Sequence, residues 1–535
     1  MINRLFTRWY LFPFLFGVYV VNSFYTNYIF DTQVQEVAIL SVFVVLFLYL
    51  VWYIFNFLFK NVSKSSLITF VFATLFFSFQ NTVSYLRLIA IRGENIDLAR
   101  YWLSRNGQIL VFTITLILFV FILMAIKNLK KIPNSTLVFL NIATILLLIF
   151  SIFRLIQKIE QDKEVRKEFV RSWDTFLESS TQFANSNNEL TPNVYYIILD
   201  GFARSDILLE LYHYDNSNFI QALKERGFYI GEDSYSNYSQ TRTSLPSSMN
   251  FMYLLNLEKF RDQQDISNFP LYYMLENSIV ENQFSAFGYR MISFISDYSF
   301  SNFSDWDEHY ENKFIPPRFT QTFFNSTAAS VFVNPYLYKW HRYNVNFIFD
   351  GLSKTPMLKG PFFVFAHISC PHPPFVFEAD GKLKKEGRLF LSNDQDGFQL
   401  IGTSEEYLLG YRDQVKYLEK KTLSMIDEIL NNSSEPLILI LQADHGPGMQ
   451  SYFMGVENVN LEERMSILNA YYFFDQDYRS LYPSISPVNT FRVIFSQYLG
   501  IELPLLEDYQ YYSTFLTPYD LIPVSEKIQK GSTAE

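Results

Sequence analysis

A buried β-strand is predicted at Val194-Tyr-Tyr-Ile-Ile-Leu199, a continuous apolar run that is rich in β-forming residues. Such runs are typical of strands that are covered on both faces in a parallel sheet. The same pattern recurs at Phe362-Phe-Val-Phe-Ala366, Leu437-Ile-Leu-Ile-Leu441 and Tyr471-Tyr-Phe-Phe474. Helical stretches at 217–226 and 404–430 lie between these runs. We therefore expect an α/β domain with a mostly parallel sheet sandwiched by helices.

Side chains that bind metals follow three of the four runs. They are Asp200 after the first run, His367 and His372 after the second, and Asp444-His445 after the third. In such sheets ligands bind outside the carboxyl ends of the strands, so we expect these residues to meet at one edge. A single Asp there is more often a turn former or a helix cap, and a lone His is more often structural. Three of the six histidines at one edge favour a site for zinc or manganese, which oxygen and nitrogen ligands suit.

A hydroxyl-rich segment, Ser239-Gln-Thr-Arg-Thr-Ser-Leu-Pro-Ser-Ser-Met-Asn250, lies between the first and second strands. Alone, it is equally typical of a loop that enters a helix, with Thr243 or Ser244 as the N-cap. Beside a divalent cation a threonine hydroxyl has a second use, because coordination stabilises its alkoxide as a nucleophile. The N-terminus of the helix would add positive potential for a phosphate.

Charged residues are absent from five windows in the first third of the chain, namely 9–30, 37–59, 65–86, 106–126 and 132–153. Each window is longer than the roughly 20 residues that a helix needs to cross the hydrocarbon layer, where a charge is costly. We therefore expect a five-helix transmembrane bundle. Gln80, Asn81 and Ser84 make the third window the most polar. The stretch 319–338 also lacks charge, but its polar residues and Pro335 argue against a further span.

Basic residues beside these windows predict the orientation of the chain. Seven of them lie in the cytoplasm if the N-terminus is inside, and four lie outside. The seven are Arg4, Arg8, Lys60, Lys64, Lys127, Lys130 and Lys131, and the four are Arg87, Arg92, Arg100 and Arg105. Five spans then place the C-terminal domain on the extracytoplasmic side of the inner or plasma membrane. We expect a transmembrane domain at 1–157, a connecting or interfacial helix at 158–191, a catalytic domain at 192–523 and a frayed tail at 524–535.

The composition excludes several classes of protein. The net charge of -10 and the pI near 5.3 argue against a nucleic-acid partner, which would require a basic surface. Cys370 is the sole cysteine, so the chain can form no internal disulfide and no cysteine-based zinc cluster. A transporter is disfavoured because the five windows carry no charged residue to line a pathway.

The catalytic motifs resemble those of the alkaline phosphatase and sulfatase superfamily. The family's Thr-x-x-Ser-x-Pro pattern matches Thr241-Arg-Thr-Ser-Leu-Pro246, and its Asp-His-Gly matches Asp444-His445-Gly446. Five spans followed by an outward domain resemble the membrane-anchored branch, the lipoteichoic acid synthases and lipid A phosphoethanolamine transferases. The resemblance implies one divalent metal bound by Asp200, Thr241, Asp444 and His445. It also implies that His367 and His372 lie near the substrate phosphate or a second metal.

The function that this resemblance implies is a metal-dependent membrane phosphotransferase. Thr241 would attack the phosphorus of a phospholipid such as phosphatidylethanolamine or phosphatidylglycerol, releasing diacylglycerol and leaving a phospho-threonine diester. A hydroxyl of a cell-envelope glycan or lipid would then accept the phosphoethanolamine or phosphoglycerol group. His367 or His372 would transfer protons, and Arg242 would either clamp the phosphate or be a solvated surface residue. Zinc or manganese is the expected metal, with magnesium and a second ion left open.

Departures from the family pattern leave two alternatives open, a phosphodiesterase-like or sulfatase-like hydrolase of the same fold and a non-catalytic envelope-assembly protein. Pro447-Gly448 follows the Asp-His-Gly motif where relatives often carry an acidic residue. The phosphoethanolamine enzymes have Glu in place of Asp200, and they have several disulfides. A true sulfatase requires Cys or Ser followed by x-Pro-x-Arg, whereas Cys370 is followed by Pro-His-Pro-Pro. In Ser244-Leu-Pro-Ser-Ser248, a serine stands where the Arg is required.

Overall fold

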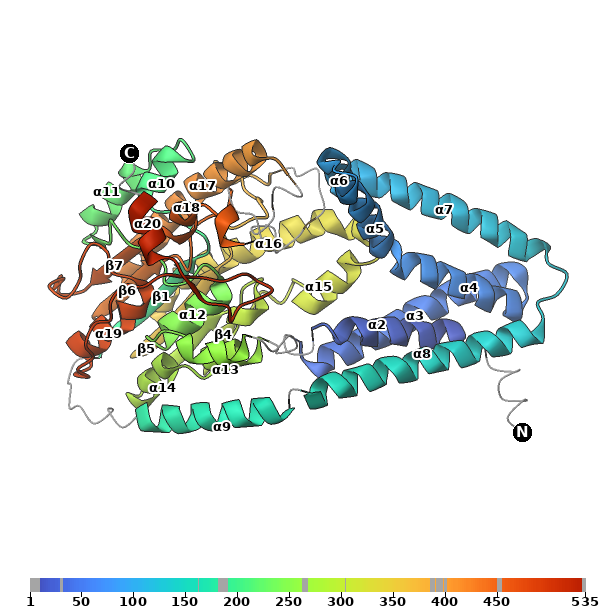
Figure 1. Cartoon of the computed structure of the whole chain (residues 1–535), viewed down its shortest axis with the longest axis horizontal. Coiled ribbons are helices and arrows are strands. Elements are labelled where there is room, and N and C mark those ends of the chain that lie inside the picture. Colours follow the sequence, from blue (N-terminus) through green and yellow to red (C-terminus); the bar gives the residue numbers. More distant parts are fainter. Residues whose placement is uncertain are drawn as a thin grey trace. The chain divides into compact units, whose positions relative to one another are not determined.

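The computed structural model describes residues 10–28, 32–161, 163–180, 191–261, 268–303, 305–384, 390, 398, 402–449 and 455–531. The chain forms two compact units (Figure 1). The first contains Met1–Glu164, Pro316–Leu337 and Gly387–Phe390, and the second contains Val165–Ile315, Tyr338–Glu386 and Leu391–Glu535. The unit boundary therefore assigns part of the second half of the sequence to the N-terminal unit.

The first unit is built mainly from apolar helices. Its N-terminal helices are α2 (Phe12–Tyr25), α3 (Val34–Phe59), α4 (Val62–Phe77), α5 (Phe79–Arg92), α6 (Ile96–Leu103), α7 (Arg105–Asn128) and α8 (Asn134–Gln161). Among the described residues, the helices that begin at Val34, Arg105 and Asn134 are long and apolar enough to cross a membrane. The bent pair α4 and α5 raises this number to four if it forms a single span. A fifth membrane span would have to be α2, which has only 14 residues. The expected number of five spans therefore stays a prediction.

The surface of these helices identifies the first unit as a membrane domain. Ile39, Phe57, Phe121 and Phe139 are among many large apolar side chains that are exposed along α3, α7 and α8. Water solvates such continuous apolar faces poorly, whereas lipid chains solvate them well. The expected third span, 65–86, differs from a straight helix, because α4 and α5 meet at an angle of 45° around Ser78.

The second unit contains a seven-stranded sheet in the order β2-β7-β6-β1-β5-β3-β4. The strands are β1 (Asn193–Leu199), β2 (Tyr229–Ile230), β3 (Arg290–Phe294), β4 (Glu308–Tyr310), β5 (Phe362–Ile368), β6 (Leu437–Gln442) and β7 (Asn469–Phe473). β1 pairs in parallel with β5 and β6, so that Val194 lies opposite both Phe363 and Ile438. β7 is antiparallel to β6. The predicted mostly parallel sheet is therefore confirmed, with antiparallel pairing at one edge.

Helices cover both faces of this sheet (Figure 1). One face packs against α9 (Lys163–Ser180), α12 (Thr241–Met249), α13 (Phe269–Glu276), α14 (Ile279–Ala286) and α19 (Pro487–Tyr498). On the other face lie α10 (Ser205–Glu210), α11 (Ser217–Glu225) and α17 (Ser404–Asn432). Every residue of β1 is buried, which explains why this strand reads as an uninterrupted apolar run.

The remaining helices and strands complete the described chain. They are α15 (Arg318–Asn325), α16 (Ser330–Leu352), α18 (Leu461–Met465), α20 (Ser525–Gly531), β8 (Tyr511–Tyr512), β9 (Ile522–Pro523) and 3-10 helices at Leu255–Phe260, Ser299–Ser301, Thr355–Met357 and Val456–Asn458. α20 differs from the expected frayed tail at 524–535, because Val524 and Ile528 are buried against Met465 and Tyr512. The proposed connecting helix at 158–191 coincides with α9 in part, and its residues 181–190 lie outside the described residues.

Candidate active site

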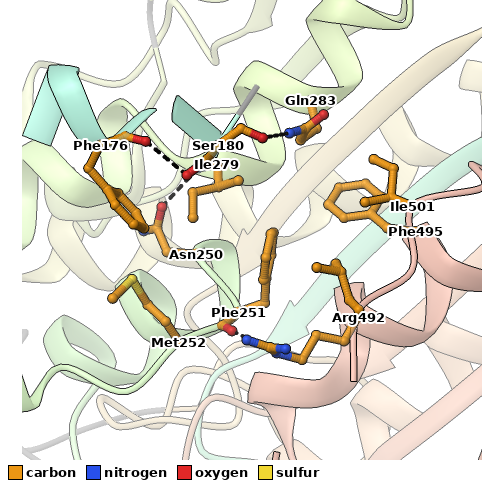
Figure 2. Close-up of a pocket in the computed structure, with 11 residues that line it drawn as sticks. Phe176, Ser180, Asn250, Phe251, Met252, Ile279, Gln283, Arg492, Phe495 and Ile501 are labelled. Carbon is orange, nitrogen blue, oxygen red and sulfur yellow. Dashed lines mark hydrogen bonds between the residues drawn. The ribbon is translucent and has the colours of Figure 1, made fainter. Parts of the chain in front are cut away.

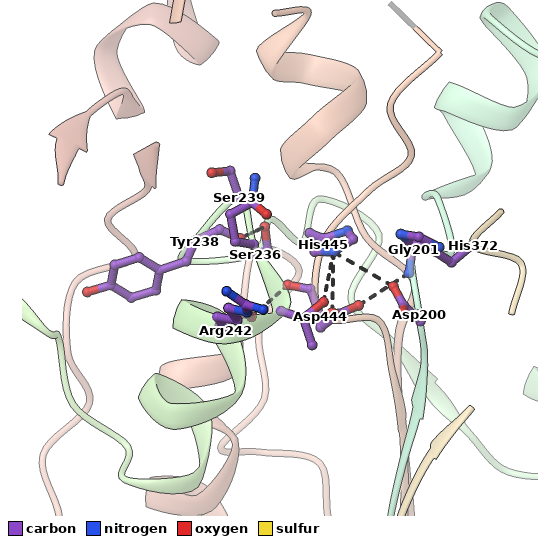
Figure 3. Close-up of polar contacts among 12 residues, drawn as sticks. Asp200, Gly201, Ser236, Tyr238, Ser239, Arg242, His372, Asp444 and His445 are labelled. Carbon is purple, nitrogen blue, oxygen red and sulfur yellow. Dashed lines mark hydrogen bonds and ion pairs between the residues drawn. The ribbon is translucent and has the colours of Figure 1, made fainter. Parts of the chain in front are cut away.

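Three of the predicted metal ligands converge at the carboxyl edge of the two central strands (Figure 3). Asp200 follows β1, while Asp444 and His445 follow the neighbouring strand β6. Each offers one ligand atom, and these atoms all lie within 4.8 Å of one another. His445 Nε2 is 3.4 Å from Asp444 Oδ2 and 3.7 Å from Asp200 Oδ1. All three side chains are buried, so the parallel register of β1 and β6 builds a compact polar site.

Thr241 completes this group as the first residue of α12. Its Oγ1 lies 3.1 Å from His445 Nε2. A second contact joins α12 to the loop that follows β6. Ser244 Oγ donates a 2.6 Å hydrogen bond to the carbonyl of Asp444. Gln240 is the N-cap, so neither Thr243 nor Ser244 has the capping position that the hydroxyl-rich segment also allowed. The structure thus brings all four predicted ligands together, and their roles stay predictions.

The chemistry of these residues fits a divalent cation. Asp200 Oδ1 and Asp444 Oδ2 are buried, and neither has a hydrogen-bond partner among the described residues. An unsatisfied buried carboxylate oxygen is costly, and a bound cation removes that cost. His445 Nδ1 is 3.0 Å from the carbonyl of Gly446, which suits a tautomer that donates there and keeps a lone pair on Nε2. Two carboxylates, an imidazole and a hydroxyl form a donor set of the kind that zinc and manganese accept.

The electrostatics of the site support the same assignment. Burial and the negative charge of Asp200 raise the pKa of Asp444 to about 6. Burial also opposes ionisation of Asp200, but the nearby imidazoles of His372, His367 and His445 outweigh it and hold its pKa below the ordinary value. Burial and the charge of Arg464 lower the pKa of His445 to about 3, which keeps this imidazole neutral and able to bind a metal. Two carboxylates in one buried site repel each other, and a divalent cation would relieve that repulsion.

His367 lies inside β5, opposite Ile198, and not past the end of the strand as the sequence suggested. The strand is longer than expected because its pairing with β1 continues to Ile368. His367 Nε2 is 3.4 Å from Asp200 Oδ2, and its Nδ1 is 2.7 Å from Ser301 Oγ. Burial disfavours the protonated ring, but the contact with Asp200 outweighs burial and raises the pKa of His367.

The other two predicted residues also lie beside the group. The backbone N–H of His372 donates a 3.0 Å hydrogen bond to the carbonyl of Asp200, and its ring centroid is 6.5 Å from that of His445. Arg242 follows Thr241 on α12 (Figure 3). Its Nε donates a 3.1 Å hydrogen bond to Tyr298 Oη, and its guanidinium carbon is 3.9 Å from the ring centroid of Phe515. Arg242 is therefore a half-buried, stacked cation and not a freely solvated one.

Arg464 supports the site but gave no recognisable signal in the sequence. Its side chain is buried, its Nε donates to the carbonyl of Ser239 at 2.8 Å, and its Nη1 donates to the carbonyl of Gly446 at 3.4 Å. It thereby joins the loop before Thr241 to the loop after His445. In the sequence, Glu462-Glu463-Arg464 has the polar character of an exposed helix face, so only the three-dimensional contacts reveal this role.

The glycine of the Asp-His-Gly motif is required by close packing. A Cβ at Gly446 would lie 2.1 Å from the carbonyl oxygen of Glu463 and 3.0 Å from the carbonyl carbon of Arg464, and both are backbone atoms that cannot rotate away. We therefore expect Gly446→Ala to cost about 1–3 kcal/mol through overpacking and to displace His445. Thermal unfolding and bound metal, measured on the same sample, test this expectation.

The control for this substitution is Gly93→Ala, where a Cβ would make only ordinary contacts of 3.5 Å. We expect Gly93→Ala to leave both readouts unchanged. Unchanged unfolding and metal content in Gly446→Ala would contradict the packing argument.

A separate cavity of about 340 Å³ lies at the C-terminal end of α12, away from Thr241 at its N-terminus (Figure 2). Its lining is mainly apolar and includes Phe176, Phe251, Ile279 and Phe495, with Arg492 beside them. None of the predicted site residues lines this cavity. The cavity and the polar group around Asp200 are therefore distinct features of the second unit.

Several solved structures are similar to this chain, each at low sequence identity and a TM-score below 0.5. No curated protein sequence matches the chain significantly. Among solved structures, the C-terminal periplasmic domain of EcEptC from Escherichia coli is similar at 13% identity and a TM-score of 0.42, covering 65% of this chain and 97% of that domain. The lipooligosaccharide phosphoethanolamine transferase A from Neisseria meningitidis is similar at 10% identity and a TM-score of 0.38, covering 84% of this chain and 90% of that one. A protein of the alkaline phosphatase superfamily from Vibrio parahaemolyticus is similar at 12% identity and a TM-score of 0.37, covering 63% and 80%.

The model of the Sulfatase family matches residues 192–483, which is more than half of the chain. The match begins just before β1 and extends beyond β7, so it includes the whole seven-stranded sheet. It also includes Asp200, Thr241, Asp444 and His445. The chain therefore belongs to the Sulfatase family and is a sulfatase-like enzyme whose α/β domain follows a set of apolar N-terminal helices.

Proposed function

We propose that this protein is a metal-dependent membrane phosphotransferase whose catalytic domain lies on the extracytoplasmic side of the membrane. It takes a phosphoethanolamine or phosphoglycerol group from a phospholipid and transfers it to a hydroxyl of an envelope glycan or lipid. The observation that carries this proposal is the position of Thr241 Oγ1, 3.1 Å from His445 Nε2, beside the buried carboxylates of Asp200 and Asp444. A hydroxyl in that position suits nucleophilic attack on phosphorus.

A divalent cation held by Asp200, Thr241, Asp444 and His445 would lower the pKa of the Thr241 hydroxyl and offset charge on the phosphoryl oxygens. Thr241 Oγ1 forms a bond to phosphorus as the bond from phosphorus to the diacylglycerol oxygen breaks. The hydroxyl proton of Thr241 ends on that diacylglycerol oxygen. In the second half, the acceptor oxygen bonds to phosphorus, the bond to Thr241 breaks, and the acceptor proton returns to Thr241.

His372 is better suited than His367 to move these protons. It is half-buried, and its ring lies near His445, so a lipid or acceptor oxygen can approach it. His367 is fully buried, and its two ring nitrogens face Asp200 and Ser301. We therefore assign proton transfer to His372 and the orientation of Asp200 to His367. Arg242, next to the nucleophile, supplies positive charge for the phosphate.

Membership of the Sulfatase family favours one competing function, a hydrolase that passes the group to water. A cysteine-derived nucleophile does not suit this chain, because Cys370 is fully buried and burial raises the pKa of its thiol well above the ordinary value. Both remaining reactions would begin at Thr241. They differ in the second step, in which either water or an envelope hydroxyl accepts the group.

Labelled phospholipids test the proposal and separate it from hydrolysis. Full-length protein in phospholipid nanodiscs is incubated with phosphatidylethanolamine or phosphatidylglycerol that carries a label in the head group. We expect labelled protein, modified at Thr241 by mass spectrometry, together with released diacylglycerol. Added lipid or glycan acceptor should remove the label from the protein and become labelled. Release of free labelled head group at the same rate without acceptor would instead identify a hydrolase, and no labelled protein from either lipid would contradict the proposed intermediate.

A further inference from the structure

Part of the sequence between two strands of the catalytic sheet packs with the N-terminal helices. Residues Pro316–Leu337 lie between β4 and β5 in the sequence, yet they belong to the first compact unit. They form α15 and the beginning of α16. No charged residue occurs between Arg318 and Lys339. The chain thus enters the membrane domain a second time, after the N-terminal helices have ended.

One side of α15 is buried in the membrane domain. Phe319 and Phe323 lie in one hydrophobic cluster with Val21, Tyr25, Leu40, Val44, Leu48, Ala73 and Phe77. The ring centroid of Phe24 is 5.4 Å from that of Phe319 and 5.4 Å from that of Phe323. Close van der Waals packing of these two rings therefore attaches α15 to the membrane helices.

The turn between α15 and α16 supplies polar partners at the break between α4 and α5. The N–H of Ala328 donates a 2.9 Å hydrogen bond to the carbonyl of Phe76, near the end of α4. Gln80 Nε2 donates to Ser330 Oγ at 2.9 Å and to Gln108 Oε1 at 2.8 Å. Polar groups at membrane depth need such protein partners, because lipid chains offer none. Residues 316–337 are therefore an integral part of the membrane domain.

The beginning of α16 presents two aromatic rings outward. Phe332 is 61% exposed and Tyr336 is 54% exposed, and their spacing of four residues places them on one face of the helix. The Phe332 ring contacts the Phe112 ring of α7, with centroids 5.4 Å apart. Beyond Phe112, α7 exposes a series of large apolar side chains that includes Ile117 and Phe121. The two rings therefore continue the lipid-facing surface of α7.

We propose that Pro316–Leu337 is an interfacial membrane anchor, in which Phe332 and Tyr336 contact phospholipids at the boundary between head groups and acyl chains. Tyr side chains are enriched at this boundary, where the apolar ring and the polar hydroxyl are both solvated, and the apolar ring of Phe332 suits the adjoining acyl chains. Phe112 supports this depth, because it lies at the start of the third turn of α7 and not at the middle of the helix. The absence of charge from 319–338 suits contact with lipid, while the short α15 and Pro335 suit a segment that does not cross the bilayer.

Single introduced cysteines test this proposal in the full-length protein. Cys370 is fully buried, so a thiol-reactive fluorophore will label Phe332→Cys or Tyr336→Cys selectively in the folded state. The labelled protein is placed in vesicles of phosphatidylethanolamine and phosphatidylglycerol that carry a spin label either near the head group or deep in the acyl chain. Phe121→Cys is the membrane control, because Phe121 is 70% exposed on α7. Leu209→Cys is the aqueous control, because Leu209 is 55% exposed on α10 of the catalytic domain.

The shallow spin label should quench the fluorophore at positions 332 and 336 at least about twofold more strongly than at position 209, as an interfacial depth requires. The deep spin label should instead quench position 121 most strongly. Quenching at 332 and 336 equal to that at 209 would overturn the proposal. Blue-shifted emission without lipid quenching would also overturn it, because a second copy of the chain would then cover the rings. The two cysteine variants are independent, so misfolding of one leaves the other as the test.

Discussion

Thr241→Ala is expected to abolish head-group transfer and the labelled protein intermediate together. Removing a nucleophile of this kind lowers kcat by roughly four orders of magnitude or more. Thr241→Ser keeps the hydroxyl and should retain part of the activity, since its oxygen can take the same position beside His445. Turnover of labelled phospholipid in nanodiscs measures both effects, and mass spectrometry of the intact protein measures the intermediate.

The chain offers a matched control for this experiment at Thr243. It lies two residues further along α12, it is fully buried, and its Oγ1 donates to the carbonyl of Gln240, at the start of its own helix. Thr243→Ala therefore removes a buried hydroxyl of the same helix without touching His445. We expect nearly normal turnover from this variant. Comparable losses in both variants would indicate a structural role for Thr241, and normal turnover in Thr241→Ala would rule it out as the nucleophile.

Asp444→Asn is expected to remove most of the bound metal. The substitution preserves shape but replaces an anionic ligand with a neutral one, so affinity should fall by more than about a hundredfold. Metal analysis of the purified protein should show close to one ion per chain in the wild type and almost none in the variant. Asp350→Asn is a suitable control, because Asp350 is exposed and pairs with Lys421 away from the site. Equal metal content in wild type and Asp444→Asn would exclude Asp444 as a ligand.

Although Asp444→Asn is expected to weaken metal binding, it is also expected to raise the thermal stability of the metal-free protein at pH 7. Burial and the charge of Asp200 raise the pKa of Asp444 to about 6, so the folded state binds a proton more tightly than the unfolded state does. The associated stability is present below the unfolded pKa near 3.8 and is lost as the pH rises through about 6. At pH 7 this stability is lost, and Asp444→Asn avoids the loss because its amide carries no charge. Metal-free Asp444→Asn should therefore unfold at a higher temperature than the metal-free wild type at pH 7, but not at pH 4.

Local sequence patterns predicted the central strands because these strands have the simplest environment. β1, β5 and β6 are covered on both faces, so each is an uninterrupted apolar run that needs no other part of the chain for its recognition. β3 and β4 escaped prediction. β3 carries Arg290 and Ser293, and β4 has three residues, so neither shows that pattern. The helix α20 was not predicted either. It depends on burial of Val524 and Ile528 against residues that are distant in the sequence, so no local pattern indicates it.

Chemical identity and order along the chain were sufficient to propose Asp200, Thr241, Asp444 and His445 as one group, because parallel strands carry the residues that follow them to a common edge. Sequence order does not specify which side chains act through others. Three such contacts join residues that are far apart in the sequence, and no local pattern predicts them. They are Arg464 with Ser239, Ser301 with His367, and Tyr298 with Arg242. The attachment of 316–337 to the membrane helices is of the same kind. Local propensity and hydrophobicity are properties of neighbouring residues, whereas these contacts exist because folding brings remote segments together, and they appear only in three dimensions.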